Sequence, residues 1–213
     1  MKTQVFPLPG ARAKSRAGST LRRVQRLQGT PVASRILGID PGLRTTGYGV
    51  IEMRSAECGV RKSGAIGTRA LPRVPHFVQG GTIKANENDE LPERLAQLYD
   101  GMREVLREHE VEVVVIEELF STYAHPRSAL LMAHARGALM LAAQQSGARV
   151  HTFLPNEVKQ VITGNGHATK SAMQAAVRQR LNLKTTPHPH DIADALAIAL
   201  CYAARQDIGE LMG

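Results

Sequence analysis

The amino-acid sequence predicts an α/β domain in which helices flank a mixed five-stranded sheet, in the element order βββαβαβαα. Three apolar stretches follow one another with no helical pattern between them, which favours an antiparallel meander. Helix-period and β-branched segments then alternate, as expected for strands buried on both faces. The chain has 213 residues, 43% of them hydrophobic, which suits one domain with a full core.

The meander is predicted from three strands, near residues 35–40, 46–53 and 76–84. Pro41-Gly42 supplies turn chemistry between the first two. The connection 54–74 is rich in Gly, Arg, Lys and Ser and shows no clear period, so we expect a long basic loop.

The second half alternates between the two periods. Leucines and other apolar residues recur at helical spacing over 91–110, and Val111 to Ile116 is a β-branched run that predicts a buried strand. The remaining predicted elements are a helix of small residues from Ser128 to Gln145, a strand over 148–153, a short helix over 156–162, a helix from Thr169, as its cap, to about Leu181, and a last helix from Asp191 to Arg205.

Positive charge is concentrated at the start of the chain. The net charge is +8, and residues 1–35 contain eight basic residues and no acid. We therefore expect a basic, disordered leader over 1–34, a folded domain over 35–206 and a short tail over 207–213. An excess of basic residues indicates an anionic partner, most simply nucleic acid.

Other features exclude whole classes of protein. The two cysteines, Cys58 and Cys201, form no metal-binding or redox spacing and suit a reducing compartment. No apolar run reaches membrane-spanning length, and the leader lacks the apolar segment of a secretory signal. These observations predict a cytoplasmic protein with no membrane partner.

Four acids carry the candidate chemistry. Asp40 and Glu117 each end a predicted strand, and Asp191 and Asp194 lie one turn apart on one face of the last helix. Acids gathered at one edge of a sheet repel one another unless cations hold them. Oxygen ligands suit Mg²⁺ or Mn²⁺, and a pair of such ions is a standard means of cleaving a phosphodiester.

Plainer interpretations stay open for each of these residues. Asp40 before Pro-Gly is also good turn chemistry. Acids in the first turn of a helix, such as Asp191 and Asp194, are favoured by the helix dipole. Lys159 and Lys170 are, by base rate, solvated lysines, and Phe120 is equally compatible with a core position.

Four ordered motifs resemble RuvC, the bacterial Holliday-junction resolvase family of RNase H-like endonucleases. The resemblance spans roughly residues 35–205. It is carried by the segments ILGIDPGLRTTGYGVI, VVVIEELF, EVKQVITGNGHATKSAMQ and HDIADALAIAL. It implies an RNase H-like fold and Mg²⁺-dependent endonuclease activity on four-way DNA junctions, in DNA recombination and repair.

The resemblance also implies roles for individual residues. Asp40, Glu117, Asp191 and Asp194 match the catalytic, metal-binding quartet, which holds two Mg²⁺ ions per subunit, with Mn²⁺ able to substitute. Asp191 stands where some members have His, so its role is the least certain of the four. DNA-binding positions match Phe120, an aromatic that wedges junction bases, and Lys159 and Lys170, which meet the scissile phosphate region.

The implied partners are four-way junction DNA, a second copy of the chain in a homodimer, and the RuvA–RuvB branch-migration complex. Two features depart from the family pattern: the basic leader, and the loop 54–74, which is longer than the family form. Neither touches the quartet.

Two other classes of function compete with this interpretation. Gly38-Ile39-Asp40-Pro41-Gly42 followed by Gly49-Val50 also resembles the phosphate-binding hairpin of actin-like ATPases and sugar kinases. Those proteins need a second lobe and a second hairpin, which this sequence does not offer. A catalytically silent DNA-binding module would need a broken quartet, and this quartet is intact.

Overall fold

The computed structural model describes residues 34–55, 73–119 and 126–212, all within one compact unit, Ala33–Gly213. These residues form a five-stranded sheet in the order β3-β2-β1-β4-β5. The strands are β1 (Ser34–Asp40), β2 (Thr45–Ser55), β3 (Arg73–Lys84), β4 (Val113–Glu117) and β5 (Arg149–Phe153). β1, β2 and β3 pair antiparallel, as the predicted meander requires, whereas β4 runs parallel to both β1 and β5.

Five helices complete the described residues. They are α2 (Leu91–His109), α3 (Pro126–Ser146), α4 (Pro155–Thr163), α5 (Lys170–Arg180) and α6 (His190–Met212). The predicted element order βββαβαβαα has two helices after the last strand. The structure has three, because the short helix expected over 156–162 forms as α4. Thr169 caps α5 as predicted, accepting a hydrogen bond from the N–H of Ala172 at 3.3 Å.

The last helix is longer than its sequence pattern indicates. We expected α6 to end at Arg205 and a short tail to follow, but the backbone stays helical to Met212. Ile208, Leu211 and Met212 still follow helical spacing, so the sequence is compatible with this longer helix.

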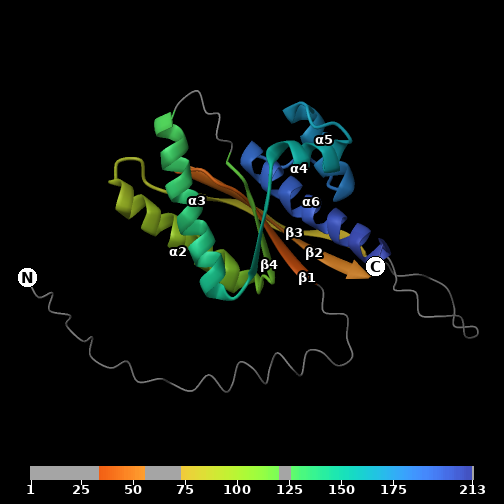
Figure 1. The fold of residues 1–213 in the computed structure, drawn as a ribbon, viewed down its shortest axis with the longest axis horizontal. Helices are drawn as coiled ribbons and strands as arrows, with labels where there is room; N and C mark the ends of the chain where they lie inside the picture. The colour runs from red at the N-terminus through yellow and green to blue at the C-terminus, as the bar shows by residue number, and fades with distance from the viewer. Residues whose placement is uncertain (1–33, 56–72, 120–125, 213) are drawn as a thin grey trace, which may run out of the picture. The chain divides into compact units, whose positions relative to one another are not determined.

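The two faces of the sheet carry separate cores. α4, α5 and α6 pack on one face and α2 and α3 on the other (Figure 1). Alternate residues of β1 divide between these cores: Ile36 faces α6, whereas Leu37 and Ile39 face α2 and α3. The same alternation in β4 sends Val115 to the α6 side. Because side chains alternate along a strand, the residues that end β1 and β4 both belong to the α6 face.

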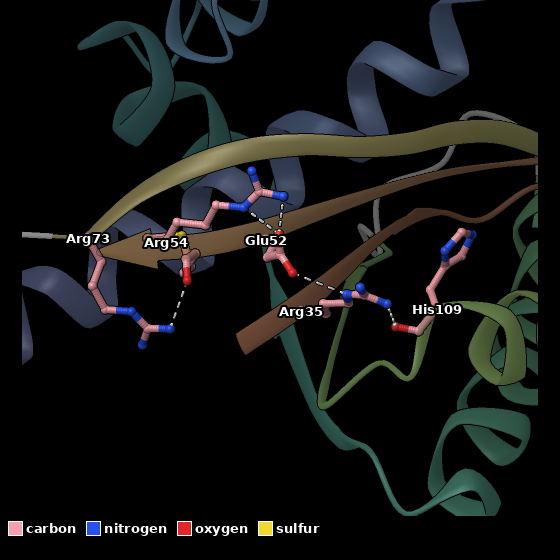
Figure 2. A network of polar contacts seen from close by, with 6 residues as sticks. Arg35, Glu52, Arg54, Arg73 and His109 are labelled. Carbon is pink, nitrogen blue, oxygen red and sulfur yellow. Dashed lines mark hydrogen bonds and ion pairs between the residues drawn. The ribbon is translucent and has the colours of Figure 1, made fainter. Parts of the chain in front are cut away.

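A network of ion pairs and hydrogen bonds ties the opposite end of the sheet together (Figure 2). Glu52 of β2 pairs with Arg35 of β1 and with Arg54. Arg35 also donates to the backbone carbonyl of His109, 2.9 Å away, which anchors the end of α2 to the first strand. Arg73 donates to a backbone carbonyl of β2. This network joins the start of β1, the end of β2 and the start of β3, and it lies away from the ends of β1 and β4 that carry the acids.

None of the helices in the described part of the chain combines the length and the hydropathy needed to cross a membrane.

Candidate active site

Asp40 and Glu117 end two neighbouring parallel strands. The register of β1 on β4 runs to the pair Ile39–Ile116, so the next residue of each strand is one of the two acids. Both side chains project toward the α6 face by the alternation described above. The prediction that two strand-terminal carboxylates meet at one edge of a mixed sheet is therefore confirmed.

Close contact between α6 and the sheet brings the acids of the last helix to this edge. A methyl group added to Gly38 would overlap the carbonyl oxygen of Ala195, and one added to Gly47 would lie 2.7 Å from the Cβ of Asp191. Gly47 is also the β2 partner of Asp40. Only residues without a Cβ allow so close an approach, so these glycines set the distance between α6 and Asp40.

A cavity of about 280 Å³ opens between these elements. Asp40, Glu117 and Asp194 line it together with Lys159 of α4 and Lys170 of α5. Its remaining lining residues are Pro155, Val158, Met173, Ala197 and Ile198. The structure thus gathers five of the seven residues singled out in the sequence around one space.

The other two candidates stand apart from this group. Asp191 does not line the cavity, although its charge acts on both Asp40 and Asp194. Phe120 lies outside the described residues, so its predicted wedge role stays a prediction.

The carboxylates have strongly perturbed acidities. Burial raises the pKa of Asp40 to about 8, and the charges of Glu117, Asp194 and Asp191 add to the shift. Burial and the charge of Asp194 raise the pKa of Glu117 to about 7. The pKa of Asp194 is also raised, mainly by burial. Removal from water and mutual repulsion both penalise the ionised forms, so an excess of negative charge is costly here and Asp40 stays largely protonated at neutral pH when no cation is bound.

Two lysines offset part of this excess. Lys170 lowers the pKa of Asp40, Glu117 and Asp194, and Lys159 acts on the latter two. The sequence offered no buried cation among the four acids, and Lys170 is indeed exposed while Lys159 is half-buried. Their charges nevertheless reach the cavity, which favours a functional role over an ordinary solvated one.

The donor set suits a divalent cation with few protein ligands. In the described residues, no three Asp, Glu, His or Cys side chains are close enough to hold one ion together. Mg²⁺ commonly binds through one or two carboxylates and completes its shell with water and substrate phosphate oxygens. Three carboxylates around an open cavity, with raised pKa values, fit that mode of binding.

Sequence reasoning missed the residues that shape the turn after Asp40. Thr46 is fully buried, and its hydroxyl bridges the turn by donating to the carbonyl of Gly42 at 2.8 Å and accepting from the N–H of Gly42 at 3.2 Å. A Thr in a predicted strand is ordinary, so nothing in the pattern marked it. The close approach at Gly38 and Gly47 had a weak signal, since isolated glycines inside strand patterns often mark tight backbone contact.

Comparison with known proteins assigns the chain to a family. The family model described as crossover junction endodeoxyribonuclease RuvC matches residues 36–78 and 73–202. The chain belongs to the RuvC family. The matched residues include all four acids and both lysines, so the family assignment and the cavity rest on the same part of the chain. The two matched pieces overlap at residues 73–78, in the first half of β3, directly after the connection that we expected to be longer than the family form.

Named RuvC proteins match over most of their length. The chain is 44% identical over 182 residues to crossover junction endodeoxyribonuclease RuvC of Rhodopirellula baltica, covering 84% of this chain and 93% of that protein. It is 40% identical over 169 residues to RuvC of Chloroflexus aurantiacus, covering 79% and 92%.

Solved structures confirm the RNase H-like fold that the resemblance implied. Thermus thermophilus RuvC matches with a TM-score of 0.67 and 33% identity, covering 82% of this chain and 96% of that one. The same protein in complex with its Holliday junction substrate matches with a TM-score of 0.69 and 32% identity, covering 83% and 96%.

Proposed function

We propose that this protein is an endonuclease that resolves four-way (Holliday) DNA junctions by paired symmetric nicks, in recombination and repair. The observation that carries the proposal is the cavity in which carboxylates from β1, β4 and α6 face two lysines, in a chain of the RuvC family. The Thermus thermophilus relative bound to a Holliday junction substrate supports the choice of DNA.

The reaction we propose is metal-dependent hydrolysis of a phosphodiester. Asp40, Glu117 and Asp194, with Asp191 beside them, would hold Mg²⁺, or Mn²⁺ in its place, at two ions per subunit. Such ions supply an activated water and stabilise the leaving 3′-oxygen. Asp40 would be the central residue of this set, because it lies between the carboxylate of the neighbouring strand and those of α6.

The lysines serve a different purpose in this proposal. Lys159 and Lys170 enter the cavity from α4 and α5, on the side away from the sheet. A point charge on a flexible stem is well suited to a phosphate oxygen. We propose that they bind the backbone around the scissile phosphate, while Phe120 stacks against junction bases.

Two symmetric nicks need two active sites related by a two-fold axis, so we propose a homodimer. The candidate surface is α3. One side of this helix is buried at Ala135 and Leu139, but Leu130 is 64% exposed and Leu141 53% exposed. Large apolar side chains left exposed on a helix are typical of a surface that a partner covers. A protein that sediments as a monomer at working concentrations would contradict the dimer.

The proposal also covers a partner complex and the basic leader. We propose that a cytoplasmic RuvA–RuvB complex is the partner, and that residues 1–34 form a basic leader attached to a nuclease domain over 35–206. Seven positive charges in the leader would add contacts to phosphates. Each lost contact lowers the log–log salt slope of binding by about 0.9, so truncation near Ser34 tests this role.

The actin-like ATPase interpretation loses its support. Its argument rested on the hairpin around Asp40 alone, whereas the family match covers nearly all of the described residues. The DNA-binding module without catalysis also becomes the weaker alternative, because three acids line one cavity.

Cleavage of a synthetic four-way junction tests the proposal. We expect full-length protein with Mg²⁺ to introduce paired nicks at symmetric positions, and EDTA to abolish them. Asp40→Asn should remove nearly all cleavage and keep junction binding, because binding rests on basic contacts to phosphates. Asp100→Asn, an exposed acid on α2, is the matched control and should cleave normally. Full cleavage by the Asp40 variant would refute the assignment.

A further inference from the structure

The carbonyl of Glu117 lies just past the last rung of the β1–β4 ladder. That ladder ends with the pair Ile39–Ile116. The N–H of Glu118 donates to the carbonyl of Phe153 in β5, 2.9 Å away. Backbone groups of successive strand residues point to opposite sides, so the carbonyl of Glu117 points toward β1.

The sequence removes the donor that would normally meet this carbonyl. In a parallel ladder continued by one rung, the N–H of residue 41 would lie opposite the carbonyl of residue 117. Residue 41 is Pro41, which has no N–H. A buried backbone carbonyl without a donor is costly, so the end of β4 needs a hydrogen bond from elsewhere.

Arg136 supplies that hydrogen bond from α3. Its Nε donates to the carbonyl oxygen of Glu117 at 3.0 Å. Arg136 is half-buried, and its neighbours Ala135 and Leu139 are fully buried in the core between α3 and the sheet. The guanidinium is therefore held in a fixed direction by the packing of the helix.

The guanidinium acts on the backbone and not on the carboxylate. The charges that shift the pKa of Glu117 are those of Asp194, Lys159 and Lys170, and Arg136 is not among them. A guanidinium that acted as a counter-ion to the carboxylate would also shift the pKa of Glu117. The contact is instead of the kind by which an outer residue fixes the orientation of a ligand.

We propose that Arg136 is a positioning residue, which fixes the peptide following Glu117 and so aims the Glu117 carboxylate into the cavity. The inference rests on the proposed metal-dependent cleavage and adds a residue from the opposite helical layer to it. Without the hydrogen bond from Arg136, the last peptide of β4 is held on one side only, by its N–H to the carbonyl of Phe153, because Pro41 offers no alternative donor.

Metal binding without DNA provides a readout that a purely structural role would not change. We would titrate full-length protein with Mn²⁺ and follow free Mn²⁺ by electron paramagnetic resonance. For Arg136→Met, which has no donor where Arg136 has its Nε, we expect Mn²⁺ affinity and single-turnover cleavage to fall about 10–100-fold, the usual effect of losing an outer-shell partner. Junction affinity, measured in Ca²⁺, should stay within about twofold.

Two further variants make the result interpretable. Arg136→Lys keeps a donor, one bond farther from the backbone than Nε, and should recover part of the Mn²⁺ affinity. Arg107→Met removes the same charge from an exposed site on α2 and should match the wild type. If Arg136→Met does not fold, Arg136→Lys carries the test, with a partial loss of Mn²⁺ affinity expected and wild-type affinity counting against the proposal.

The outcomes separate this proposal from the one on which it rests. Wild-type Mn²⁺ affinity in folded Arg136→Met would overturn the positioning role. A lower melting temperature with unchanged Mn²⁺ affinity would also overturn it, since the role would then be structural. Absence of cleavage by the wild-type protein would instead refute the proposed function, whatever the Arg136 variants show.

Discussion

Replacing Asp40 by Asn should stabilise the metal-free protein at alkaline pH. The pKa of Asp40 is raised from 3.8 to about 8 by burial and by the neighbouring acids. Between these two values the folded state binds more protons than the unfolded state, so stability falls as pH rises through this window. Asn carries no charge and removes this dependence.

The size of the effect follows from the pKa shift. A shift of about four units corresponds to at most about 6 kcal/mol, at about 1.4 kcal/mol per unit. The Asn amide still loses water and forgoes the attraction to Lys170, so we expect a gain of about 2–4 kcal/mol at pH 8.5. For a chain of this length, each kcal/mol moves the melting temperature by about 2–4 °C. The variant should therefore melt roughly 5–15 °C higher.

Thermal melts in EDTA at pH 8.5 and pH 5.0 measure this effect. At pH 5.0 the folded wild type already has Asp40 protonated, so the gain should shrink. Mg²⁺ at pH 8.5 should stabilise the wild type more than the variant, because cations relieve the same repulsion. Asp100→Asn should leave the melting temperature unchanged. A variant that melts no higher than the wild type at pH 8.5, or whose gain is equally large at pH 5.0, would refute the reasoning.

Three further predictions follow from named contacts. Gly47→Ala puts a methyl group against Asp191 and should displace α6. We expect the unfolding free energy to fall by about 1–3 kcal/mol and the cleavage rate to fall at least tenfold. Cleavage at the wild-type rate would show that the distance between α6 and the sheet is not critical. Thr46→Val removes both hydrogen bonds to Gly42 and should cost about 1–3 kcal/mol, measured by urea unfolding, while Thr46→Ser should retain most of the stability. The hydrogen bond from the backbone N–H of Leu154 and the charge of Arg205 lower the pKa of Glu157. The ionised side chain therefore stabilises the fold above about pH 4.5, and this stabilisation is lost as the pH falls further. The melting temperatures of Glu157→Gln and wild type should converge near pH 3, and a difference that stays constant with pH would contradict this.

The fold was predictable because the apolar residues of most strands and helices recur at the spacing of that secondary structure. The meander, the buried run of β4 and the helices with one apolar side each carry a pattern that only one secondary structure satisfies. The end of α6 was placed too early, although Ile208, Leu211 and Met212 keep helical spacing. The short helix over 156–162 was predicted and forms as α4, although the element order βββαβαβαα left it out.

The candidate site was predictable only in part. Strand-terminal acids could be placed at one edge from chemistry, and the family resemblance supplied the lysines. Arg136 could not be found, because no motif or spacing marks a functional residue in the helix of small residues predicted from Ser128 to Gln145. Its partner is a backbone carbonyl, which leaves no trace in the sequence. The one available signal was Pro41, whose missing N–H has consequences on the neighbouring strand.

The two helical layers make different contributions to the site. Every charge that acts on the cavity comes from β1, β4, α4, α5 or α6, all of which meet on one face of the sheet. The α2–α3 layer contributes backbone hydrogen bonds instead, through Arg136 to Glu117 and through Arg94 to the carbonyl of Leu43 in the turn after Asp40. Substitutions in the first layer should therefore change the pH dependence of cleavage. Substitutions in the second should change its rate and metal affinity at an unchanged pH profile, because they move the carboxylates without altering the charges around them.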